Sequence, residues 1–254
     1  MKIYEKPDRI KIAVVAVGGE GVRIGAKNNP KLLLKLAGQP FLAYVLNMLL
    51  GQFECIYLLT GSYGEQISTF VRLVYPDQIE HSIHLVNGGK EGNAKAIARL
   101  SGCINEPFLY MDGNVICSPS IVRTLVSSPL SAITLLVSPV SLVNTHLHVE
   151  LKENKIVKMF PLVHDEWQKS GLFCSLGVMT INPALFNLSP NMKSFNDLDL
   201  VIDFIFKNRA DLEIRPVVYS DWWCCIHTMR DLRLAKKYGM QLFSELSKTV
   251  ELTG

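Results

Sequence analysis

The sequence predicts an α/β fold with a mostly parallel, mixed sheet flanked by helices. Short apolar runs rich in Val and Ile end at glycine or polar residues, which is typical of strands buried on both faces. These runs alternate with segments of helical periodicity, and such alternation implies right-handed crossovers between parallel strands. The composition, 48% apolar and 19% charged, is that of a globular chain with a sizeable core. The expected architecture is therefore Rossmann-like.

The alternation begins with the apolar run IKIAVVAV at 10–17, which stops abruptly at Gly18 and Gly19. Because ligands of parallel sheets bind beyond the carboxyl ends of the strands, functional residues are expected after Val17, Val86 and Met111. The strands expected after the first are at 55–59, 83–86, 107–111 and 132–137, and the helices between them at 41–50, 65–74, 92–100 and 119–126.

The second half of the chain has a different pattern. Two apolar segments flank Glu153 and Asn154, a turn signal that predicts a hairpin of 147–151 with 156–160. Asp and Asn residues before 198–206 suit the N-terminus of a helix, whose apolar stripe is expected in the core, with a homo-oligomer face as the alternative. The other expected elements are strands at 174–181 and 213–219 and helices at 183–186 and 229–246.

No linker interrupts these 254 residues, so we expect a single domain, 1–254, with a nucleotide-binding half at about 10–130 and a substrate half at about 131–254. The net charge of +3 is too small to favour nucleic acid as a partner. No apolar run approaches the roughly 18 residues of a membrane helix. The six cysteines contain no C-x-x-C pair, and we expect a reducing cytoplasm.

The segment after the first strand, GGEGVR at 18–23, predicts an anion-binding loop. Its glycines allow positive φ and close approach of the backbone to a ligand, and successive N–H groups of such a turn bind phosphate oxygens. Arg23 adds a planar cation, and Lys31 follows eight residues later. Glycine spacing alone equally fits an ordinary turn, and the segment is neither a P-loop nor a G-x-G-x-x-G fingerprint.

The longer stretch AVGGEGVRIGAKNNPKLLLKLAGQPFLAYVL resembles the amino-terminal signature of sugar-nucleotide pyrophosphorylases, L-A-G-G-x-G-[ST]-R-L, then P-K, then V-x-G-x-P. Further segments similar to this family are LTGSYGEQI at 59–67, GNAKA at 92–96, LGVMTINP at 176–183 and IHTMRDL at 226–232. The resemblance spans roughly 12–235 and implies the nucleotidyltransferase (GT-A-like) fold.

The resemblance implies a reaction between a nucleoside triphosphate and a sugar 1-phosphate, or a similar phosphorylated alcohol, for nucleotide-sugar and surface-polysaccharide synthesis. It places Arg23 at the β- and γ-phosphates and Lys31 at the α-phosphate, with Asp112 as a third catalytic residue. It implies sugar binding at Gly177. The implied nucleotide-binding residues are Gly18, Gly19, Glu20, Gly21, Val22, Asn87, Gly92 and Asn93.

The metal positions depart from the family pattern. Family enzymes usually bind Mg²⁺ through two aspartates, and this chain has Asn114 and Cys225 at those places, with His227 after the second. Three interpretations stay open. Asp112 recruits Mg²⁺ from two residues away on an extended segment; Cys225 and His227 bind a softer ion such as Zn²⁺; or catalysis is lost and the domain binds nucleotide or sugar phosphate, or regulates a partner.

Two other enzyme classes fit less well. A nicotinamide-dependent oxidoreductase requires an acidic residue at the end of the second strand, where this chain has Thr60 and Gly61. A glycosyltransferase of related fold requires D-x-D, which Asp112, Gly113 and Asn114 match only in part. Nucleotidyl transfer is therefore the favoured hypothesis, and the base, the sugar and the retention of catalysis stay open.

Overall fold

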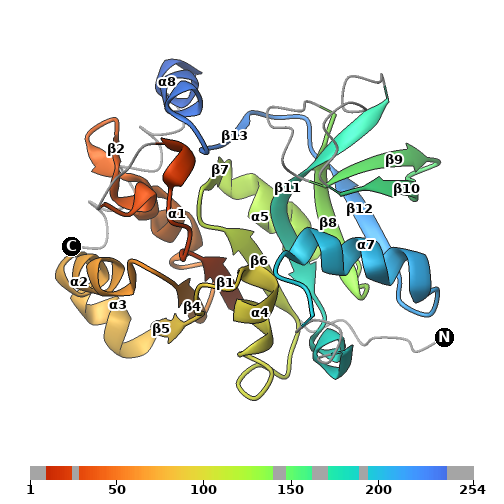
Figure 1. Cartoon of the computed structure of the whole chain (residues 1–254), viewed down its shortest axis with the longest axis horizontal. Coiled ribbons are helices and arrows are strands. Elements are labelled where there is room, and N and C mark those ends of the chain that lie inside the picture. Colours follow the sequence, from red (N-terminus) through yellow and green to blue (C-terminus); the bar gives the residue numbers. More distant parts are fainter. Residues whose placement is uncertain (1–9, 25–28, 140–146, 162–170, 189–193, 239–254) are drawn as a thin grey trace. The chain divides into compact units, whose positions relative to one another are not determined.

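A computed structural model describes residues 10–24, 29–139, 147–161, 171–188 and 194–238. It confirms the α/β class, because its strands form a mixed sheet and helices flank it (Figure 1). The chain divides into two compact units, and each combines segments that are distant in sequence. We name them by their described residues: the glycine-loop unit is 11–24, 29–90, 112–120 and 221–238, and the hairpin unit is 10, 91–111, 121–139, 147–161, 171–188 and 194–220.

Parallel strands form the sheet of the glycine-loop unit. β1 (Ile12–Ala16) pairs with β4 (Cys55–Thr60), which pairs with β5 (Ile83–Asn87), and both pairs are parallel. The first four residues of β1 are buried, in keeping with a strand covered on both faces. The carboxyl ends of these strands therefore lie along one edge, as the alternating pattern predicts.

Helices connect these strands. Figure 1 shows α2 and α3 side by side and next to β5, and Ile67 and Val71 of α2 are buried. α3 was not expected from the sequence, although Pro76 at its first turn is a start signal. The helical elements of this unit are α1 (Phe41–Leu49), α2 (Gly64–Val74), α3 (Pro76–His81), α8 (Met229–Tyr238) and the 3-10 turns η1 (Val22–Ile24) and η2 (Lys31–Leu33).

Two small antiparallel pairs complete the unit, and periodicity predicted neither. β2 (Lys35–Leu36) pairs with β3 (Gln39–Pro40). β7 (Val115–Cys117) pairs with β13 (Trp223–Cys225), which brings two parts of the chain together across more than a hundred residues. Trp223 is 1% exposed, so this ladder is part of the core.

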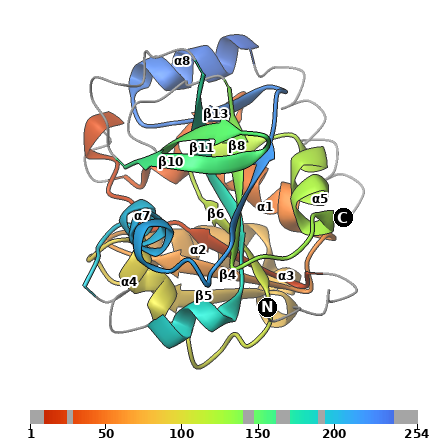
Figure 2. The ribbon, with the colours of Figure 1, turned by 90° about the vertical axis from the view of Figure 1, so that its right-hand side faces the viewer.

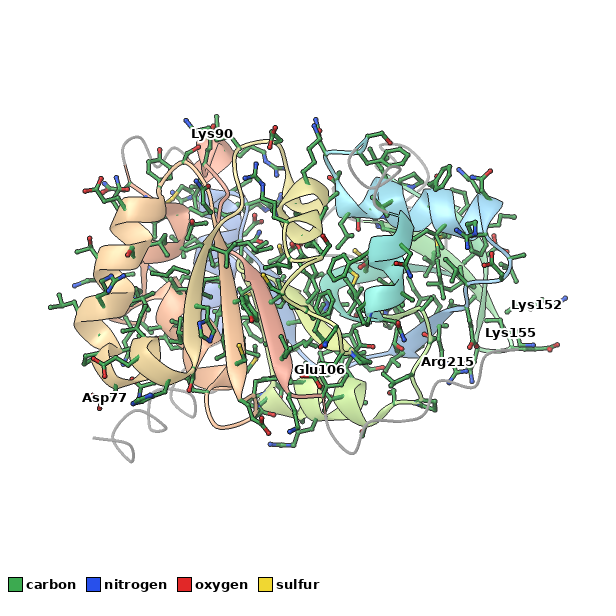
Figure 3. The ribbon with its side chains drawn as sticks, turned by 90° about the horizontal axis from the view of Figure 1, so that it is seen from below. Asp77, Lys90, Glu106, Lys152, Lys155 and Arg215 are labelled. Carbon is green, nitrogen blue, oxygen red and sulfur yellow. The ribbon has the colours of Figure 1, made fainter. Side chains whose placement is uncertain are left out.

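The hairpin unit is built around the ten-residue strand β11 (Leu172–Ile181). This strand pairs antiparallel with β6 (Phe108–Asp112), β8 (Ile133–Ser138) and β9 (His148–Lys152). β9 also forms the predicted hairpin with β10 (Lys155–Phe160), and Glu153 and Asn154 of its turn have positive φ. Lys152 and Lys155 mark the outer end of this hairpin in Figure 3.

β12 (Ile214–Val218) pairs parallel with β8 and extends the sheet of the hairpin unit. α7 (Leu198–Asn208) packs against β10 (Figure 2), and its amino terminus is capped as predicted, because Asp197 accepts a hydrogen bond from the Asp199 N–H. The short helix expected at 183–186 is instead the 3-10 helix η3 (Pro183–Leu188). The remaining helices are α4 (Asn93–Ala98) and α5 (Pro119–Ser127).

Candidate active site

The glycine loop follows β1 at its carboxyl end, where the backbone is tightly packed. A Cβ on Gly18 would lie 3.2 Å from Gly61 Cα, and a Cβ on Gly61 would lie 2.6 Å from the Gly18 oxygen. The ends of β1 and β4 therefore approach each other too closely for a side chain on Gly61. The severe clash thus falls on Gly61, which the sequence pattern did not single out, whereas Gly18 itself is only tightly packed.

The same loop lies against the side chain of Lys31. Gly21 has a φ of +69°, and a Cβ there would lie 2.8 Å from Lys31 Cβ. A Cβ on Gly19 would lie 3.7 Å from Lys31 Cε. The structure therefore brings together two features that the sequence separates by ten or more residues, the glycine loop and the lysine.

Lys31 begins η2, and its side chain is largely buried. Its Nζ donates a hydrogen bond to the Ile226 oxygen over 3.4 Å. Burial lowers the pKa of Lys31 below 10.5, while the nearby Cys225 and Asp112 act to raise it. The loop thus lies over a cation that has lost much of its water, and such a cation interacts more strongly with an anion than an exposed one does.

Arg23 and Val22 belong to η1, and both are exposed, Val22 by 78%. Arg23 lies near enough to Lys31 for its charge to lower the Lys31 pKa. Two cations therefore lie near each other at the loop, as the sequence predicts. The exposure of Arg23 leaves its guanidinium accessible to a phosphate.

Glu20 and Asn87 bond within the glycine-loop unit. The Glu20 carboxylate accepts a hydrogen bond from Ser62 Oγ over 2.7 Å, which ties the loop to the turn after β4. Asn87 ends β5, and its Oδ1 accepts a bond from the Gly89 N–H over 3.0 Å. In Figure 3 Lys90 lies at this end of the unit, and Asp77, at the start of α3, lies at the opposite end. Nucleotide contact by Glu20 and Asn87 stays a prediction.

Asp112 ends β6, and the next two residues form a turn rather than an extended segment. The Gly113 N–H donates to the Ala16 oxygen over 2.9 Å, and a Cβ on Gly113 would lie 2.6 Å from that oxygen. The extended geometry expected for Asp112 and Asn114 is therefore wrong, because the chain turns between β6 and β7. Asn114 instead faces β13.

Asn114 and Cys225 contact each other, although 111 residues separate them. The Asn114 Nδ2 donates to Cys225 Sγ over 3.1 Å and to the Ile226 oxygen over 3.3 Å. The Ile226 N–H donates back to the Asn114 oxygen over 2.9 Å. The two positions that depart from the family pattern thus form one buried contact beside Lys31.

His227 belongs to the same group of side chains. Its Nδ1 lies 3.5 Å from Cys225 Sγ, and its Nε2 lies 3.3 Å from Asn114 Nδ2. Its backbone is held by Asp231, whose Oδ2 accepts bonds from the His227 and Thr228 N–H groups over 2.9 and 2.7 Å. Thr228 Oγ1 accepts in return from the Asp231 N–H. Sequence reasoning missed this capping role, which the T-x-x-D spacing before α8 signals.

These donors do not fit Mg²⁺ well. Mg²⁺ prefers oxygen ligands in octahedral geometry. At the turn after β6, the Asn114 side chain points its amide nitrogen at a thiol and not at a metal. Asp112, at the start of this turn, is the carboxylate that the turn contributes. Among the described residues, no group of three or more His, Cys, Asp or Glu side chains is arranged to hold a metal ion.

Three predicted binding residues belong to the hairpin unit and are held there by close contacts. Gly92 has a φ of +108°, and a Cβ there would lie 1.9 Å from the Asn196 oxygen. Asn93 accepts from the Leu198 N–H over 2.8 Å and donates to the Tyr110 hydroxyl over 3.2 Å. Gly177 has a φ of +68° within the irregular part of β11. Their binding roles stay predictions.

All six cysteines are free thiols. Burial raises the pKa of Cys117 to about 12 and also raises that of Cys224. In the described part of the chain, no helix combines the length and the apolar character that crossing a membrane requires.

Known proteins resemble this chain in sequence and in fold. No family model matches it. A bifunctional protein GlmU of Methanococcus maripaludis (strain C5) is 20% identical over 243 residues, which are 94% of this chain and 57% of that protein. The chain spans 44% of a second GlmU, from strain C7, and thus about half the length of these curated relatives.

Two solved structures have similar folds. An inositol-1-phosphate CTP transferase from T. maritima superposes with a TM-score of 0.74 at 20% identity, over 95% of this chain and 96% of that one. A UDP-glucose pyrophosphorylase complexed with UDP-glucose superposes with a TM-score of 0.73 at 18% identity, over 91% and 99%. The fold implied by the amino-terminal motif is confirmed: this chain has the fold of the sugar-phosphate nucleotidyltransferases.

Proposed function

We propose that this chain transfers a nucleotidyl group from a nucleoside triphosphate to the phosphate of a sugar 1-phosphate or a similar phosphorylated alcohol. The observation that carries the proposal is the position of Lys31 against the glycine loop, where a Cβ on Gly21 would lie 2.8 Å from the lysine Cβ. A loop that both exposes backbone amides and covers a largely buried cation suits a polyphosphate better than an uncharged ligand.

In the proposed reaction, an oxygen of the acceptor phosphate attacks the α-phosphorus. The bond from the α-phosphorus to the oxygen bridging it to the β-phosphate breaks, and pyrophosphate leaves with that oxygen. Amides of the glycine loop and the Arg23 guanidinium hold the β- and γ-phosphates. Lys31 donates to the α-phosphate and offsets the charge that develops on it, which is worth most where water is excluded.

Three further features support the proposal. The likeness to an inositol-1-phosphate CTP transferase and to a UDP-glucose pyrophosphorylase favours a phosphorylated polyol or sugar as acceptor. The free thiols favour a reducing compartment such as the cytoplasm. A divalent ion is expected to accompany the triphosphate, with Mg²⁺ as the family's usual ion.

The test is a screen of the purified chain for pyrophosphate release. ATP, CTP, GTP, UTP and dTTP are each combined with a panel of sugar 1-phosphates and inositol 1-phosphate, in Mg²⁺, Mn²⁺ and Co²⁺. We expect one base and one acceptor class to give release, and Lys31→Met to abolish it. Release that persists in Lys31→Met would refute the assigned role of the lysine.

A second candidate function is nucleotide binding without catalysis. It is favoured by Asn114 and Cys225, which occupy the positions of the metal-binding aspartates in the family that this sequence resembles. Silence across the whole screen, together with nucleotide binding by calorimetry, would replace the transferase proposal with this one.

A further inference from the structure

The ammonium of Lys31 lies close to both the glycine loop and the backbone that follows β13. Its Nζ donates to the Ile226 oxygen over 3.4 Å, and a Cβ on Gly19 would lie 3.9 Å from the same nitrogen. An ammonium carries three N–H donors, so the bond to Ile226 leaves donors for a phosphate oxygen at the loop. The Ile226 oxygen therefore helps to set where the ammonium lies when the loop holds an anion.

Asn114 holds the Ile226 backbone at both its N–H and its C=O. The Ile226 N–H donates to the Asn114 backbone oxygen over 2.9 Å, and Asn114 Nδ2 donates to the Ile226 oxygen over 3.3 Å. A carbonyl oxygen can only accept, so the side-chain atom that faces it has to be the amide nitrogen. Both residues are buried. One asparagine thus fixes the oxygen that Lys31 contacts.

The Asn114 side chain turns its N–H groups towards the second position where the family that this sequence resembles has an aspartate. Its Nδ2 donates to Cys225 Sγ over 3.1 Å as well as to the Ile226 oxygen. A metal ion is bound by lone pairs, and the N–H end of an amide dipole repels a cation. The contact of Asn114 with Cys225 therefore does not fit a metal ion.

Lys31 places a full positive charge beside this amide, since both nitrogens bond to the Ile226 oxygen. The charges of Arg23 and Asp112 also reach Lys31. A divalent ion here would meet two cations across a partly dehydrated space, where like charges repel strongly. In the part of the chain that the structure describes, His, Cys, Asp and Glu side chains do not gather in threes to hold an ion. The lysine therefore replaces a metal as the local positive charge.

We infer that Asn114 is a positioning residue that holds the Lys31 ammonium, through the Ile226 oxygen, in place of a protein-bound metal, so that a triphosphate binds without any divalent ion held by the chain. This deepens the proposed function and rests on it for the class of ligand. A divalent ion that accompanies the triphosphate is held by the phosphates alone. Its removal therefore leaves the affinity of the chain for the ligand nearly unchanged.

Calorimetry tests this inference without reference to activity. ATP, CTP, GTP, UTP, dTTP and inorganic tripolyphosphate are each titrated into the full chain, in excess EDTA and in excess Mg²⁺. For the ligands that bind, we expect the Kd in EDTA to lie within about fivefold of the Kd in Mg²⁺. A larger loss of affinity in EDTA would overturn the metal-free site, as would a failure of all six ligands to bind in either buffer.

Asn114→Asp tests the positioning role. It keeps the size of the side chain, but it places an oxygen where the N–H faces Ile226 and offers Mg²⁺ a carboxylate. We expect the affinity to fall about tenfold in EDTA and to recover in Mg²⁺. Asn208→Asp adds the same charge at the exposed end of α7 and is the matched control, which should keep the parent values in both buffers. An equal loss in both buffers is what a merely structural role predicts, and it would overturn the assignment.

Asn114→Ala removes the donor without adding a charge, and it serves as the second variant if the aspartate prevents folding. It should lose affinity in both buffers, because neither Mg²⁺ nor a new carboxylate replaces the lost contact. Circular dichroism verifies that each variant is folded. A folded Asn114→Ala chain that binds as tightly as the parent would overturn the positioning role.

The two proposals can fail separately. Binding that persists in EDTA without pyrophosphate release under any condition would sustain the metal-free site and refute the transferase. Pyrophosphate release accompanied by binding that requires Mg²⁺ would sustain the transferase and refute the metal-free site.

Discussion

The glycine loop and the end of the β7–β13 ladder both lie close to Lys31, and they differ in how closely they keep the family pattern. The loop keeps its glycines, and packing against Lys31 explains Gly21. At the ladder, Asn114 and Cys225 contact each other over 3.1 Å. The family that this sequence resembles has aspartates at these two positions. The contrast teaches that the loop and the ladder are separate segments of the chain, so the residues of one can change while those of the other are kept.

The largest effect is expected for Lys31→Met. It removes the cation that both regions contact while keeping much of the apolar stem. Turnover should fall by about 10²–10³, the usual cost of losing one preorganised charge at a transition state. Lys35→Met, at an exposed neighbouring lysine, is the control and should stay near the parent rate. Steady-state pyrophosphate release measures both, and equal rates for the two variants would show that Lys31 has no special role.

The ladder side of the comparison is tested by Asn114→Asp combined with Cys225→Asp. The two carboxylates supply hard oxygen donors, so the Mg²⁺-supported rate should rise at least about tenfold (~1.4 kcal/mol in the barrier). Without metal the buried charges should lower the melting temperature, and Mg²⁺ should restore it. A melting temperature indifferent to Mg²⁺ would mean that the position does not bind a metal.

The loop side is tested by Gly21→Ala against Gly38→Ala. Both glycines have positive φ, so both substitutions should cost about 1–2 kcal/mol of stability. A Cβ on Gly21 also meets Lys31, whereas a Cβ on Gly38 has open space. Turnover should therefore fall about 10- to 100-fold only in Gly21→Ala. Urea unfolding measures the loss of stability, and initial rates measure the loss of turnover. Equal turnover in both variants would exclude a role for the contact between Gly21 and Lys31.

The smallest effect is on stability and follows from the lowered pKa of Lys31. Burial disfavours its charged form, so between the lowered pKa and 10.5 the unfolded chain holds a proton that the folded chain has lost. Stability therefore rises with pH through that window, and below it the folded chain carries the cost of the buried charge.

Lys31→Met removes that cost. It should be more stable than the parent at the lowest pH of the series, and the difference should shrink as the pH approaches 10.5. Urea denaturation across the series measures it. A variant less stable than the parent by a constant amount at every pH would contradict the sign.

Sequence patterns were sufficient to predict the long strands and helices, and also the helix cap and the hairpin turn. Continuous apolar runs predicted β1 and β4, because strands buried on both faces need such runs. The cap at Asp197 and the turn at Glu153 and Asn154 depend on neighbouring residues alone, and both were predicted correctly. The expected helix at 229–246 is α8 as far as Tyr238, and its remainder lies outside the described residues.

The sequence by itself determined the α/β class, the glycine loop and the pair of cations, since these follow from periodicity, φ preference and side-chain charge. Only the tertiary structure showed that the Gly21 turn packs on Lys31 and that Asn114 faces Cys225. Short strands such as β7 and β13 have no periodicity of their own, and they form because partners more than a hundred residues apart pair with each other. The contact of Asn114 with Cys225 is therefore long-range, and a local pattern cannot show that these two side chains meet.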